Sequence, residues 1–157
     1  MKNGKKNVAA IIFQGENDDD VRVITYGRLL YEVERFANVL KGMGVRKGDR
    51  VSVYLPMIPE LPITLLACAR IGAIHSVVFA AFGADSVYNR VVDCTPKVIV
   101  TSDGSYHGGK TINMKAKVDE ILEKDTSIEH VIVVKRTGIE TKMKAERDIW
   151  WHEEIAD

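Results

Sequence analysis

The sequence has few of the residues that create special chemical environments. Its 157 residues include two cysteines, four prolines and two tryptophans. Neither Cys68 nor Cys94 belongs to a Cys-x-x-Cys pair or a Cys/His cluster, so no metal site is indicated. Cys68 lies in the apolar run Leu65–Ala69, and we expect it to be a buried free thiol. This cysteine usage fits a reducing cytosol.

Excess charge of one sign is also missing, and so are long apolar runs. Twenty-two Lys and Arg residues balance twenty-two Asp and Glu residues, which gives no general attraction to nucleic acid or to anionic membranes. The first six residues are basic, but no apolar signal-peptide core follows them. The longest apolar stretch, residues 61–69, contains Pro62 and is too short to span a bilayer. We therefore expect a cytoplasmic protein whose residues 1–6 are disordered.

The apolar pattern alternates between the strand and helix types. Residues 8–13 predict a short buried strand, which can pair with Val21–Ile24 as a hairpin across the polar turn 15–20. Thr25 is a candidate N-cap for a helix with apolar residues at spacings of three and four up to Met43. Further strands are predicted at 50–55, 74–79, 97–101 and 130–134, and further helices at 59–71, 85–94, 113–122 and 146–155.

This alternation predicts one α/β domain over residues 1–157. A mostly parallel sheet with helices on both faces, a Rossmann-like three-layer arrangement, is the expected fold. In such sheets ligands bind in the loops beyond the carboxyl ends of the strands. The loops at 80–85 and 103–111 are therefore the candidate ligand-binding segments.

The segment Gly104–Thr111 matches the phosphate-binding pattern G-x-x-x-x-G-K-[ST] letter for letter. A P-loop NTPase, with Lys110 on the phosphates and Thr111 on Mg²⁺, is one interpretation. Three observations oppose it: the better helix cap is Asn113, the next strand ends in two basic residues where an NTPase needs an acidic one, and little chain remains to complete an NTPase sheet. An anion-binding turn with His107 and Lys110, or a plain solvated turn, are the other interpretations.

Short segments along nearly the whole chain follow the order found in one enzyme family. They are ITYG from Ile24, RFANVL from Arg35, KGDRV from Lys47, YLPMIPE from Tyr54, LACARIGAIHSVVF from Leu66, EHVIVVKRTG from Glu129 and RDIWW from Arg147. From about residue 7 to residue 155 the chain resembles the AMP-forming acetyl-CoA synthetases of the adenylate-forming superfamily. The resemblance implies that the chain forms part of the large N-terminal domain of such an enzyme.

The resemblance implies substrates and site residues as well. The family converts acetate, ATP and coenzyme A to acetyl-CoA, AMP and pyrophosphate through acetyl-adenylate, with Mg²⁺. It implies that the glycine-rich segment meets the nucleotide end of coenzyme A, with His107, Gly108, Gly109 and Lys110 where the family commonly has Arg-Ala-Gly-Arg. Lys110 keeps a positive charge but loses the bidentate fork of arginine. Ala81 stands in a Phe-Ala-Ala-Phe segment where the family usually has Phe-Gly-Gly-Phe, so its Cβ would shift a contact with coenzyme A.

The family's ATP-phosphate signature, a Ser/Thr/Gly-rich loop that ends in lysine, does not occur in the sequence. We therefore assign no catalytic residue, expect no tightly bound cofactor and expect no ligase activity from this chain alone. A non-catalytic module that binds coenzyme A or a nucleotide is the alternative. The family's sheet is completed by later strands, so we expect an exposed apolar edge and self-association through it. Trp150 and Trp151 are expected to anchor the last helix.

Overall fold

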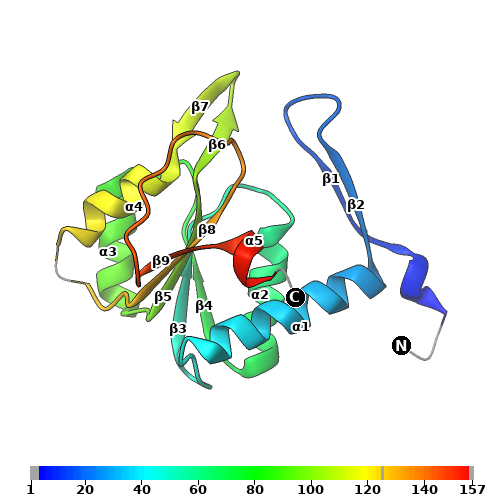
Figure 1. The fold of residues 1–157 in the computed structure, drawn as a ribbon, viewed down its shortest axis with the longest axis horizontal. Coiled ribbons are helices and arrows are strands. Elements are labelled where there is room, and N and C mark those ends of the chain that lie inside the picture. Colours follow the sequence, from blue (N-terminus) through cyan, green and yellow to red (C-terminus); the bar gives the residue numbers. More distant parts are fainter. Residues whose placement is uncertain (1–3, 125, 156–157) are drawn as a thin grey trace.

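The body of the molecule is a five-stranded sheet with strand order β4-β3-β5-β8-β9 (Figure 1). The computed structural model describes residues 4–124 and 126–155. All four neighbouring strand pairs in this sheet are parallel. The strands are β3 (Arg50–Val53), β4 (Ile74–Val77), β5 (Val98–Ser102), β8 (His130–Val134) and β9 (Asp148–Trp150). The predicted α/β fold with a mostly parallel sheet is therefore confirmed.

Helices cover both faces of the sheet and complete the three layers (Figure 1). One face carries α1 (Tyr26–Gly42), α2 (Glu60–Ile71) and the short α5 (Trp151–Glu154), and the other carries α3 (Ala84–Cys94) and α4 (Met114–Leu122). Alternate residues of β5 supply the two apolar cores: Val98 and Val100 face α1 and α2, whereas Ile99 faces α3 and α4. This alternation is the period of two that a strand imposes on its side chains.

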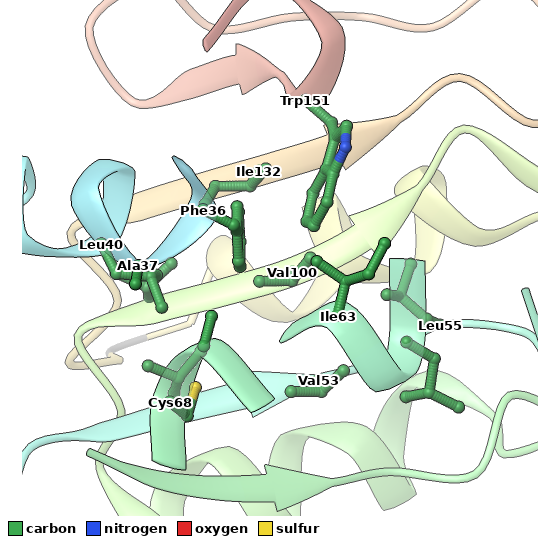
Figure 2. Close-up of a cluster of buried hydrophobic side chains, with 14 of the residues drawn as sticks. Phe36, Ala37, Leu40, Val53, Leu55, Ile63, Cys68, Val100, Ile132 and Trp151 are labelled. Carbon is green, nitrogen blue, oxygen red and sulfur yellow. The ribbon is translucent and has the colours of Figure 1, made fainter. Parts of the chain in front are cut away.

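The core under α1 joins distant parts of the chain (Figure 2). The rings of Phe36 and Trp151 stack with centroids 4.0 Å apart, so the end of the chain is anchored on the first long helix. The anchoring role expected for Trp151 is confirmed. Cys68 in α2 is a fully buried free thiol, as predicted, and burial raises its pKa to about 12.

A separate hairpin stands beside the body (Figure 1). Its strands, β1 (Ala9–Gln14) and β2 (Val21–Thr25), pair antiparallel, as the sequence predicts. The prediction that residues 8–13 form a buried strand is wrong, because the register pairs Ile12 with Val23 on an outer face where they are 74% and 60% exposed. Phe13, on the opposite face, packs against the body. A short apolar run does not distinguish a buried strand from a hairpin with one free face.

Both ends of the chain differ in detail from the sequence-based expectation. Residues 1–3 lie outside the described residues, whereas Lys5 and Lys6, within the segment expected to be disordered, belong to the 3-10 helix η1 (Lys5–Asn7). The predicted helix 146–155 is wrong over β9, which pairs in parallel with β8. Glu146 has a φ of +66°, which a helix cannot continue through. Ile149 and Trp150 have strand propensity, but their pairing partner, β8, is supplied only by the tertiary fold.

One edge of the sheet is apolar and open. The edge strand β4 leaves Ile74 54% exposed and Val77 47% exposed, and Phe79 just after it is 63% exposed. Across the part of the chain that the structure describes, no helix combines the length and hydropathy needed to cross a membrane.

Candidate functional site

The glycine-rich segment folds as a hairpin and not as an open loop. The strands β6 (Gly104–His107) and β7 (Lys110–Asn113) pair antiparallel, with His107 opposite Lys110. The two residues between them, Gly108 and Gly109, have φ angles of +58° and +72°. A two-residue type I′ turn needs positive φ at both positions, which is why glycine is favoured there. The expectation of a loop between a strand and a helix is therefore corrected.

The hairpin also explains the resemblance to a P-loop. Lys110 and Thr111 lie in β7, and α4 begins only after Asn113, whose side-chain oxygen accepts the N–H of Ala116 at 2.8 Å. A P-loop instead places its Lys and Ser/Thr at the start of the helix. Gly104 is needed for a different reason, because a Cβ there would lie 2.7 Å from Thr137 Oγ1 and 2.9 Å from the Ile112 carbonyl oxygen. The letter match thus arises from turn geometry and close packing, and the P-loop hypothesis is not favoured.

A buried aspartate holds the base of this hairpin. The Asp103 carboxylate accepts hydrogen bonds of 2.6–3.2 Å from the backbone N–H groups of Gly104, Arg136, Thr137 and Gly138. These bonds tie the end of β5 to the segment that leaves β8. Sequence reasoning missed Asp103, although an acidic residue directly after a buried strand and before glycine was an available signal.

The structure brings four of the proposed site residues together at the hairpin tip. His107, Gly108, Gly109 and Lys110 are all exposed there. Because His107 and Lys110 are directly opposite each other, their side chains leave the same face of the hairpin. The backbone N–H groups of the two glycines lie at the tip as well. The tip therefore combines positive charge with outward-facing hydrogen-bond donors.

Ala81 lies in a different turn that follows β4. The buried Tyr54 hydroxyl lies 2.7 Å from the carbonyl oxygen of Phe82 and 3.2 Å from that of Ala80, and Lys117 Nζ donates to Phe82 at 3.3 Å. Burial raises the pKa of Tyr54, so its hydroxyl stays a donor. Lys117 belongs to α4, which starts directly after β7. The structure thus links the Ala81 turn to the β6–β7 hairpin through α4 and does not place Ala81 at the tip.

The opposite face of the β6–β7 hairpin, which carries Tyr106, is joined through Arg136 to the β1–β2 hairpin, which we call the arm. The Arg136 guanidinium lies between the rings of Phe13 and Tyr106, 5.4 and 5.2 Å from their centroids. It also pairs with Asp20, and this hydrogen bond lowers the pKa of the Asp20 carboxyl. A small cleft of about 240 Å³ lies between the arm and residues 56–58, next to Tyr106 and Arg136.

The tip of the arm contacts the turn directly. The Glu16 carboxylate accepts the N–H of Gly108 at 3.0 Å and the N–H of Gly109 at 3.2 Å. Sequence reasoning missed Glu16 and Arg136. No local signal could have found either contact, because 92 and 116 residues separate the partners along the chain.

A larger cavity, about 880 Å³, lies elsewhere, between α4 and residues 140–148. Its wall carries a charge network in which Lys115 Nζ lies 2.6 Å from Asp119 and 2.8 Å from Asp148, and Arg147 pairs with both carboxylates. Two cations and two anions neutralise one another there, which indicates a structural role. In residues 4–124 and 126–155, no group of His, Cys, Asp and Glu side chains is placed to hold a metal ion.

Known proteins resemble this chain over nearly all of its length. The family described as AMP-binding enzyme matches residues 2–155. An acetyl-coenzyme A synthetase of Rubrobacter xylanophilus is 58% identical over 153 residues, which are 98% of this chain and 24% of that protein. Acetyl-coenzyme A synthetase 2 of Saccharomyces cerevisiae is 53% identical over 148 residues, 94% of this chain and 22% of that protein.

A solved structure agrees with these sequence relatives. The acetoacetyl-CoA synthetase from Streptomyces lividans superposes with a TM-score of 0.86 at 32% identity, over 95% of this chain and 22% of that one. The chain therefore spans about a quarter of the length of the proteins that it matches. Its fold matches the N-terminal domain of an adenylate-forming enzyme, and the chain belongs to the AMP-binding enzyme family.

Proposed function

We propose that this chain is part of an AMP-forming acetate–CoA ligase. Such an enzyme uses ATP with Mg²⁺ to convert acetate to acetyl-adenylate and then transfers the acetyl group to coenzyme A, with release of AMP. The observation that carries the proposal is the identity of 58% and 53% to acetyl-coenzyme A synthetases over 98% and 94% of this chain. Within that enzyme, the β6–β7 turn contributes to the site for the nucleotide end of coenzyme A.

The chemistry of the turn supports a phosphate ligand. Successive backbone N–H groups in a turn with positive φ converge on one anion, and Gly108 and Gly109 have this conformation. Lys110 adds a positive charge, and His107 adds a ring N–H on the same face. A hydrogen bond to a charged group contributes about 1.5–3 kcal/mol, so the turn can bind a phosphate without the arginines of the family pattern.

Ala81 is proposed to lie along the same ligand. Its turn is fixed by Tyr54 and Lys117, and its φ is not positive, so an alanine fits this backbone without strain. The alanine Cβ would therefore affect binding only by occupying space next to coenzyme A.

We propose further that the chain alone forms no acetyl-adenylate, since no residue in it is assigned a catalytic role. A cytoplasmic location is proposed from its two free thiols, Cys68 and Cys94. Acetate-dependent exchange of pyrophosphate into ATP by the purified chain would contradict the first of these proposals.

Calorimetry with coenzyme A and dephospho-coenzyme A tests the site. We expect coenzyme A to bind about tenfold more tightly, because only coenzyme A carries the 3′-phosphate. Lys110→Ala should abolish this difference, whereas Lys135→Ala, another exposed lysine, should retain it. Equal binding of the two ligands, or no binding, contradicts the proposed site. Binding of ATP·Mg²⁺ that is lost in Lys110→Ala would instead favour a P-loop NTPase.

We also propose that the open β4 edge mediates self-association. Its exposed apolar side chains, Ile74 and Val77, stand beside unpaired backbone groups of the edge strand. Such an edge is a template for pairing with a second chain.

A further inference from the structure

The Glu16 side chain, which belongs to the arm, contacts the tip of the β6–β7 hairpin. It belongs to the turn of the arm, residues 15–20, and no other segment of the described chain places a carboxylate on these glycines. One carboxylate oxygen accepts the Gly108 N–H at 3.0 Å and the other accepts the Gly109 N–H at 3.2 Å. The two bonds are therefore a paired contact, with both oxygens of one anion on two successive backbone donors.

This geometry is that of an anion in its binding site. With φ of +58° and +72°, the two glycine N–H groups point to the same side and form a small concave site for an oxyanion. A carboxylate and a phosphate both present paired oxygens to such donors. The two donors of the turn therefore suit an anion, because the Glu16 carboxylate accepts both of them.

The arm has ion pairs with the body close to its tip, at residues 20 and 22, as well as the contact of Glu16. Arg22 in β2 pairs with both carboxylate oxygens of Glu60 in α2, at 2.9 and 3.1 Å, and Asp20, the last residue of the turn, pairs with the partly buried Arg136. Glu16, Gly108 and Gly109 are instead all exposed, so water competes for their hydrogen bonds. The Glu16 side chain can therefore leave the glycine turn while the ion pairs of Asp20 and Arg22 keep the arm docked.

We propose that Glu16 is an internal occupant of the anion-binding turn, so that the arm competes with the phosphate of an incoming ligand for the Gly108 and Gly109 N–H groups. Ligand binding then requires the Glu16 side chain to leave the turn. The identity of the ligand as coenzyme A rests on the proposed function, whereas the contact of Glu16 with the turn does not.

Hydrogen exchange in the ligand-free chain tests the contact itself. The variant is Glu16→Ala, and the matched control is Asp18→Ala, which removes one exposed carboxylate from the same turn. We expect the Gly108 and Gly109 amides to exchange about three- to tenfold faster in E16A than in the wild type, and to remain unchanged in D18A. Unchanged exchange in E16A, or an equal increase in D18A, would overturn the proposal.

Titration of the same three proteins with coenzyme A tests the competition. We expect E16A to bind about three- to tenfold more tightly than the wild type, and D18A to bind as the wild type does. If E16A binds coenzyme A no more tightly than the wild type does, there is no competition. If E16A and D18A both bind more tightly by the same factor, the effect is due to net charge, which also contradicts the proposal. If no variant binds, the proposed coenzyme A site and the competition both fail, while the exchange rates still decide whether Glu16 holds the turn.

Discussion

At the scale of single residues, Asp103 connects several backbone segments near the candidate site. Its buried carboxylate accepts from four backbone N–H groups, and an amide side chain would turn its own N–H₂ toward one or more of those donors. We expect Asp103→Asn to lower the free energy of unfolding by about 2–4 kcal/mol in urea denaturation. Asp93→Asn, at an exposed position, is the control. Equal stability of the two variants would contradict this account.

A second residue-scale prediction concerns acid. Burial by itself would raise the pKa of Asp148, but hydrogen bonds from Arg147 and Lys115 outweigh it and hold the pKa below the ordinary value of 3.8. A lowered pKa in the folded state stabilises the fold above the unfolded pKa, and this stabilisation is lost as the pH falls through the folded value. The stability gap between the wild type and Asp148→Asn should therefore be constant from about pH 7 to about pH 5 and should shrink below about pH 4.

Unfolding experiments at several pH values measure this gap. Asp93→Asn, at an exposed position, is measured alongside as the control. A gap for Asp148→Asn that stays constant down to the lowest pH at which the protein folds would contradict the prediction.

At the scale of elements, a substitution at Gly104 tests whether the β6–β7 hairpin requires glycine there for close packing. A methyl group at Gly104 would lie 2.9 Å from a backbone oxygen of β7, which cannot easily move. We expect Gly104→Ala to cost about 1–3 kcal/mol of stability. Gly42, the last residue of α1, has no positive φ, and a Cβ added there would meet open space, so Gly42→Ala should stabilise by up to about 1 kcal/mol. Thermal unfolding compares the two, and equal effects would contradict the packing role of Gly104.

The elements also show what periodicity can and cannot predict. Helices with a strong apolar stripe and a capping residue, such as α1 after Thr25 and α4 after Asn113, begin at the caps that the sequence indicates, and both caps make their hydrogen bonds. Short segments were harder to assign. The tip hairpin β6–β7 and the strand β9 owe their structure to pairing partners, and composition over three or four residues does not reveal pairing.

At the scale of the whole molecule, the layered fold followed from the alternation of strands and helices, whereas the position of the arm did not. The contacts of Glu16, Asp20 and Arg22 with the body join residues far apart in the sequence. The four tip residues were proposed from a motif and a resemblance, whereas the contact of Glu16 with Gly108 and Gly109 could be found only from the three-dimensional arrangement. The apolar outer face of the arm was misassigned for the same reason.

The open edge of the sheet gives a prediction for the whole molecule. Sedimentation velocity at increasing concentration should show association of the wild type, and Val77→Lys should reduce it because a charge on an edge strand opposes pairing. Ile12→Lys, on the exposed face of the arm, is the control and should associate as the wild type does. A monomeric wild type at every concentration, or a loss of association in I12K alone, would contradict the role of β4.

The central claim is that the Gly108–Gly109 turn binds the nucleotide end of coenzyme A and not ATP. An ¹H–¹⁵N correlation spectrum of this 157-residue chain reports on both glycine amides directly. The account predicts that coenzyme A shifts the Gly108 and Gly109 resonances at concentrations where ATP·Mg²⁺ leaves them unchanged. Shifts with ATP·Mg²⁺ and none with coenzyme A would contradict it.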